Sequence, residues 1–280
     1  MRAPAADPGM DGGWAGLYLE ESEKGRPMHS RILPLLVLIV GILQPLAGAL
    51  APVFGIGIPV GEANRAGLAP EQPMPPFFSI WSVIFAVYIA FGLAGLRKPE
   101  SWPRATGLPM LLAGVGNILW MLSAQLFNIQ LLNFILLGPI FLFSWLAARS
   151  AHELRGGSRS ASYYLGATAS GLLAGWISAA TAVSIPLTVR SLTGLGDSDF
   201  PWPMFWTTLG SAGVFAWLFA SRISASLWYF AALGWGILGI AFHNWLETGM
   251  HLIGHIAFGC LILLLLVRLT RGAKPVRPAP

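Results

Sequence analysis

Two pairs of polar residues near the C-terminus have the spacing of metal or haem ligands on a helix. His243 and Glu247 are four residues apart, and so are His251 and His255. Residues four apart lie on one face of an α-helix, where imidazole and carboxylate groups bind zinc or haem iron. In the other interpretation these groups cap a hairpin, and His255 makes a hydrogen bond one turn inside it. We favour the second, because the neighbouring apolar segments contain no further ionisable ligand.

Other chemistries lack their residues in this chain. The single cysteine, Cys260, lies in an apolar run, which excludes a disulfide framework, a cysteine zinc site and an iron–sulfur cluster. Asp197 and Asp199 form the only close carboxylate pair after residue 31, and a solvated loop explains them better than metal-dependent chemistry. No nucleophile elbow, phosphate-binding loop or dinucleotide fingerprint occurs in a suitable context. The motifs therefore support no catalysis and require no cofactor.

Apolar residues dominate the chain of 280 residues. Hydrophobic residues make up 55%, charged residues only 10%, and there are 12 Trp. Soluble domains carry about 25% charged residues, so the composition indicates an integral membrane protein. The net charge of +5 does not indicate nucleic-acid binding, because the basic residues flank apolar segments. We expect the lipid bilayer, and no nucleic acid, as a partner.

Eight apolar stretches are long enough to cross the membrane as helices, which takes about 20 residues each. They predict an all-α, polytopic integral membrane bundle of about eight transmembrane helices. The third and fourth are so close that they either form a helical hairpin or are miscounted. No span has an internal Asp, Glu, Lys or Arg, which argues against proton-coupled transport. The spans are placed near 32–54, 77–96, 108–127, 129–148, 166–188, 206–221, 225–243 and 251–269.

Basic residues lie almost entirely on one side of this topology. With the N-terminus inside, 15 of the 17 Lys and Arg residues fall on one face, and only Arg65 and Arg190 fall on the other. Cytoplasmic loops carry the excess of basic residues, and a missed helix would scramble this division. We therefore expect eight spans with both termini cytoplasmic, in a bacterial inner membrane.

Residues 1–31 are polar, show no apolar period and are predicted to be a disordered leader. Met28 is an alternative true start of the chain. From Met28 the segment also resembles a signal peptide, with the small residues 47–49 as its cleavage site. We favour a retained first helix, because the apolar run is long and Pro52 would hinder cleavage nearby. The chain is expected to end in a cytoplasmic tail, 272–280.

The tryptophans form two sets in the predicted topology. One set lies near the span ends, as the aromatic belts at membrane interfaces do: Trp102, Trp202, Trp206 and Trp245. Trp81, Trp120 and Trp176 lie within spans. There they either line a ligand pocket or only pack helices together.

Small residues repeat along the predicted fifth helix at Ala167, Gly171, Gly175 and Ala179. Their spacing of four places them on one face, which is typical of close helix–helix approach in membranes. The sequence leaves open whether this face meets a helix of the same chain or a second subunit.

The entry into the second span carries a family resemblance. Pro75 and Pro76 fix an extended approach, and a helix can begin just after them with Phe-Ser-Ile-Trp at 78–81. This Pro-rich entry resembles the tryptophan-rich sensory protein (TspO, translocator protein) family. It is similar to the longer bacterial branch, which also adds C-terminal helices with a Trp-x-x-x-Gly-Ile segment like that at 235–240.

Two further spans support the resemblance. In the third, Asn117 and Trp120 match the family's Asn/Trp third span. In the fifth, Trp176 is followed by Ala-Thr at 180–181, and Ser184 stands where the family has Asn. Order and spacing together, rather than any single motif, make the chain similar to this family.

The resemblance implies a TspO-like five-helix core at 32–190, followed by three additional transmembrane helices at 191–271. It also implies a pocket beneath the first extramembrane loop, 56–76, for porphyrins and related tetrapyrroles, including a haem-type ligand, or for sterol-like ligands. Arg65 would pair with a ligand carboxylate, and a homodimer is a family-level expectation. The other residues that the resemblance assigns to ligand binding are Phe78, Trp81, Asn117, Trp120, Trp176 and Ser184.

These features favour a multi-pass membrane sensor or receptor that binds a tetrapyrrole (porphyrin) or a similar flat apolar ligand. Flat macrocycles are well matched by Trp and Phe faces in a mostly apolar pocket. The alternative is a transporter or channel for an apolar or amphipathic small molecule. Light-dependent porphyrin degradation is an enzyme-like activity that the resemblance also allows.

Overall fold

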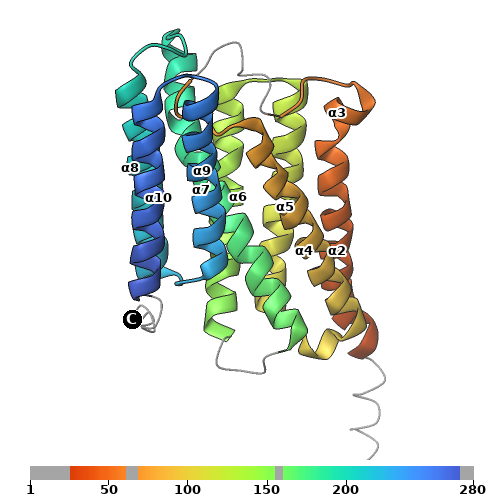
Figure 1. The fold of residues 1–280 in the computed structure, drawn as a ribbon. Coiled ribbons are helices and arrows are strands. Elements are labelled where there is room, and N and C mark those ends of the chain that lie inside the picture. The colour runs from red at the N-terminus through yellow and green to blue at the C-terminus, as the bar shows by residue number, and fades with distance from the viewer. Residues whose placement is uncertain (1–25, 61–68, 155–159, 272–280) are drawn as a thin grey trace, which may run out of the picture.

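The computed structural model describes residues 26–60, 69–154 and 160–271 (Figure 1). All regular structure in these ranges is helical, as the sequence predicts. Short elements are α3 (Leu50–Phe54) and the 3-10 turns η1 (Pro75–Ser79) and η2 (Pro99–Ser101). The long helices are α2 (Arg26–Gly48), α4 (Ile80–Arg97), α5 (Arg104–Leu126), α6 (Gln130–Glu153), α7 (Ala161–Thr193), α8 (Pro201–Arg222), α9 (Leu227–Leu246) and α10 (His251–Arg271).

Each of the eight predicted spans coincides with one of these long helices, which confirms a polytopic helical bundle. Seven helices of the described residues are long and apolar enough to cross a membrane. The helix α9 is not among them, because His243, Asn244 and its Trp and Tyr residues lower its mean hydropathy. Twelve of its 20 residues are buried. A helix surrounded by protein does not need a lipid-facing composition, since its polar groups are satisfied inside the bundle.

Several observed helix ends differ from the predicted ones, among them the start of α2 and the end of α7. The α2 helix begins at Arg26 and includes Met28, whereas the leader was expected to run to residue 31. The α7 helix continues to Thr193 and therefore contains Arg190, which the predicted span left outside. Between α5 and α6 the chain turns through Asn128, whose φ of 50° is left-handed, so the third and fourth spans form a hairpin. Residues 1–25 and 272–280 of the predicted leader and tail lie outside the described ranges.

The helix α7 lies at the centre of the bundle. It packs against α4, α6, α8 and α9, and 67% of its apolar window is buried in the protein, compared with 22% for α10. The helices α2, α4 and α5 pack on one side of it, and α8, α9 and α10 form the other side (Figure 1). The expected five-helix core and the C-terminal helices therefore share α7 as a common wall.

Glycines on α7 let α9 approach closely. A Cβ atom added at Gly175 would lie 2.2 Å from the Tyr229 carbonyl oxygen, and one at Gly236 would lie 2.8 Å from the Ala179 Cβ. Gly171 meets the start of α9 in the same way. The small-residue face of α7 thus meets a helix of the same chain, which answers the question that the sequence left open.

Candidate ligand pocket

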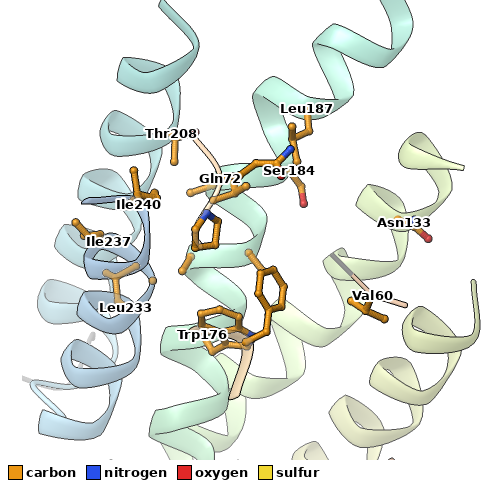
Figure 2. Close-up of a pocket in the computed structure, with 18 of the residues that line it drawn as sticks. Val60, Gln72, Asn133, Trp176, Ser184, Leu187, Thr208, Leu233, Ile237 and Ile240 are labelled. Carbon is orange, nitrogen blue, oxygen red and sulfur yellow. The ribbon is translucent and has the colours of Figure 1, made fainter. Parts of the chain in front are cut away.

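A pocket lies between α7 and its neighbours, on the side of the bundle where segment 69–79 leads into α4 (Figure 2). Its empty space, counted with the open mouth, is about 1040 Å³. Lining residues come from α4, α5, α6, α7, α8 and α9, and from Val60, Gln72 and Pro73 before η1. The described lining contains no residue of α2.

Four aromatic side chains form one wall of the pocket. Trp81 and Trp176 meet edge to face, with ring centroids 6.3 Å apart, and Phe78 meets Trp176 in the same way at 5.6 Å. Trp120 lies 6.4 Å from Trp81 at an interplanar angle of 33°. These are ordinary aromatic packing distances, so the rings hold one another in place and present a broad apolar surface to the empty space.

The C-terminal helices form the opposite wall. Leu209 and Ala212 contribute from α8, and Leu233, Ile237 and Ile240 contribute from α9. Figure 2 shows the three α9 side chains in a row on one helix face, across the pocket from Trp176. This wall is aliphatic, whereas the wall on α4, α5 and α7 is aromatic.

The described lining residues include no Asp, Glu, Lys, Arg or His. Four buried polar atoms of the lining have no hydrogen-bond partner among the residues that the structure describes: Gln72 Nε2, Trp81 Nε1, Trp120 Nε1 and Thr208 Oγ1. The two indole nitrogens and the amide nitrogen are donors only, and the hydroxyl group both donates and accepts. A buried donor without a partner costs free energy, and all four atoms belong to residues that line the pocket.

Segment 69–79 covers the pocket and is fastened to the helices around it. Glu71 is fully buried and accepts from Arg190 Nε of α7 at 2.7 Å. Asn244 Nδ2 of α9 donates to the Pro70 carbonyl at 2.7 Å. Further along, Trp235 Nε1 donates to the Phe77 carbonyl at 2.7 Å. The three residues of α7 and α9 that make these bonds, Arg190, Trp235 and Asn244, all follow residue 185 and were not among the predicted site residues.

Five of the predicted ligand-binding residues come together in the pocket: Phe78, Trp81, Trp120, Trp176 and Ser184. Asn117 does not line it. Its Nδ2 donates to Gln44 Oε1 at 2.9 Å, in the interface between α5 and α2, and its side chain is fully buried there. Arg65 lies outside the described residues.

The histidine pairs make local contacts at the turn between α9 and α10. His243 Nδ1 lies 2.6 Å from Glu247 Oε2, and His255 Nδ1 lies 2.5 Å from the His251 carbonyl oxygen. Within 26–60, 69–154 and 160–271, no three His, Cys, Asp or Glu residues are grouped so that they could hold a metal ion. His243 and Glu247 thus contact each other, and His255 bonds one turn back along α10.

A family model described as "TSPO-like protein" matches residues 60–270, well over half of the chain. The chain belongs to the TSPO-like family. No curated protein and no solved structure matches it. The match runs through α8, α9 and nearly all of α10, so both walls of the pocket lie within the region that the family model covers.

Sequence reasoning missed the residues that this TSPO-like protein contributes from its C-terminal helices. Leu233, Ile237 and Ile240 have the spacing of one helix face. That periodicity could have predicted that they line a common surface. Gln72 and Thr208 have no such signal, because nothing in their sequence context distinguishes them from other polar residues at membrane depth. Their place in the pocket follows only from how the segment before η1 and α8 pack against α7 and α9.

Proposed function

We propose that this TSPO-like membrane protein is a sensor that binds a tetrapyrrole or a similarly flat apolar ligand in the pocket under segment 69–79. One observation carries the proposal: Phe78, Trp81, Trp120 and Trp176, which come from three separate parts of the chain, line a single cavity. Apolar cavities with a few oriented polar groups are typical binding sites for small molecules. A conjugated macrocycle would stack on the indole faces and bury its edge against α9.

The binding test uses the purified full chain in lipid nanodiscs and protoporphyrin IX as the probe. Binding is followed in the porphyrin absorption band, so that removing tryptophans does not change the signal itself. Trp81→Phe combined with Trp176→Phe should weaken binding about tenfold, because each loss of an aromatic contact is worth about 0.5–1.5 kcal/mol. The matched control is Trp217→Phe, since Trp217 is 57% exposed and lies outside the pocket.

An unchanged dissociation constant in the double variant would overturn this pocket. Equal weakening in Trp217→Phe would point to non-specific binding at the lipid-facing surface. Saturable movement of the porphyrin across liposomes would favour the transporter over the sensor. Loss of the porphyrin absorption under light, with formation of a product, would identify degradation instead.

The proposed orientation places both termini in the cytoplasm and the pocket's cover on the opposite face of a bacterial inner membrane. It rests on the division of the 17 basic residues, of which only Arg65 and Arg190 fall on the covered side. In this orientation the ligand would reach the pocket from the outer face or from the outer half of the bilayer. A homodimer is part of the same proposal by family resemblance.

A further inference from the structure

Thr208 differs from four other threonines of α7 and α8. Thr181, Thr188 and Thr193 of α7 each donate to the carbonyl oxygen four residues earlier, at 2.7 Å. Thr207 of α8 does so at 2.8 Å. This is the usual way for a hydroxyl in a membrane helix to satisfy itself. Thr208 lines the pocket and is 1% exposed, and its hydroxyl has no hydrogen-bond partner within the described part of the chain.

Gln72 adds a second polar group toward the same end of the pocket. Its Nε2 atom is buried without a partner among the described residues, and Figure 2 shows Gln72 and Thr208 at the end of the pocket away from Trp176. Below Thr208 the wall continues with aliphatic side chains of α9, among them Ile237 and Ile240. A ligand that fills this part of the pocket therefore needs an aliphatic arm that ends in a hydrogen-bond acceptor.

The charges around the pocket distinguish between an ionised carboxylate and an uncharged carbonyl group as the acceptor. The described lining residues contain no cationic side chain. Arg190 is close to the cover, but its guanidinium already donates to Glu71 and to the carbonyl oxygens of Gly196 and Asp199. A carboxylate buried without a counter-charge is costly, whereas a carbonyl group with one donor is not. The surroundings thus favour an uncharged acceptor.

We infer that Thr208 and Gln72 determine the specificity of the pocket, by hydrogen bonding to an uncharged carbonyl at the end of an aliphatic arm of the ligand. This inference rests on the proposed function and adds the class of ligand: neutral esters, amides or ketones rather than free acids. It also gives α8 and α9 a role, because Thr208 and the aliphatic wall both lie beyond the expected five-helix core.

The test compares three porphyrins on the full chain in lipid nanodiscs. Etioporphyrin carries only alkyl substituents, protoporphyrin IX carries free carboxylates, and protoporphyrin IX dimethyl ester carries neutral ester carbonyls. Wild type should bind the ester about fivefold to tenfold more tightly than etioporphyrin, which corresponds to one buried hydrogen bond. The ester should also bind more tightly than the free acid.

Variants of α8 separate the hydroxyl from the fold. Thr208→Val keeps the branched shape and should reduce ester binding to the level of etioporphyrin. Thr208→Ser keeps the hydroxyl and should retain the ester preference. Thr207→Val, at an exposed position one residue away that bonds within its own helix, should behave like wild type for all three probes.

Several results would overturn the inference and leave the proposed function standing. These are equal binding of the ester and etioporphyrin, an ester preference that survives in Thr208→Val, or tighter binding of the free acid. A free-acid preference that disappears in Arg65→Gln would assign carboxylate recognition to the loop before segment 69–79. Failure of all three porphyrins to bind would overturn the proposed function, and this inference with it.

Discussion

Arg190 and Glu71 form an ion pair that is almost wholly withdrawn from water. Their side chains are 4% and 0% exposed, and Arg190 Nε lies 2.7 Å from Glu71 Oε1. The same guanidinium also donates from Nη1 to the Asp199 carbonyl at 2.8 Å. One arginine thus joins the cover of the pocket, the helix α7 and the loop that leads into α8.

Replacing Glu71 with Gln should destabilise the protein by about 3 kcal/mol, because the Arg190 charge would stay buried without its counter-charge. Thermal unfolding of the purified protein in detergent measures the change. The control is Glu153→Gln, since Glu153 pairs with Arg149 at 2.9 Å while their side chains are 59% and 46% exposed. An exposed pair of this kind contributes about 0–1 kcal/mol. Equal effects of the two substitutions would show that the buried pair does not hold the cover.

At the residue scale, residue type predicted pocket lining only in part. Trp81 and Trp176 were expected within spans and line the pocket, yet Trp102, expected in the interfacial belt, is 4% exposed and stacks on Phe91. Asn117 was expected to face the ligand and instead bonds to Gln44. Sequence position gives depth in the membrane, but the direction of a side chain depends on which helices are neighbours.

The helix α9 shows how packing, rather than composition, defines an element. Its mean hydropathy is too low for it to count among the seven helices that could cross a membrane by length and composition. It packs between α7 and α10. Hydropathy predicted all eight long helices because apolar length is a local property. It did not predict that α8 and α9 complete the pocket, because that depends on contacts between residues distant in the sequence.

Close packing of α7 on α9 gives a prediction at this scale. Gly175→Val should destabilise the protein by about 1–3 kcal/mol, since its side chain would collide with the Tyr229 carbonyl oxygen. It should also weaken protoporphyrin IX binding, because the displaced α9 carries one wall of the pocket. Gly210→Ala on α8 is the control, as a Cβ there meets nothing within 4 Å. Unfolding and binding data that do not distinguish the two variants would contradict the observed α7–α9 interface.

At the scale of the whole molecule, α8 and α9 line the same pocket as α4, α5, α6 and α7. The family match runs from 60 to 270 without separating them, and the pocket has an aromatic wall on one side and an α8–α9 wall on the other. Segment 69–79 bonds to both α7 and α9. A substitution on α8 that fills the pocket should therefore weaken ligand binding as strongly as the substitution of Trp81 and Trp176.

The dissociation constant of protoporphyrin IX for Ala212→Phe tests the central claim most directly. Ala212 lines the pocket from α8 and is 3% exposed, so the added ring competes with the ligand for space. We expect binding about tenfold weaker or worse, because overpacking costs about 1–3 kcal/mol. The control, Val214→Phe, adds bulk to the same helix at a side chain that is 53% exposed and outside the pocket, and it should bind as wild type does. Unchanged affinity in an Ala212→Phe protein that melts like wild type would contradict a ligand site shared between the five-helix core and the C-terminal helices.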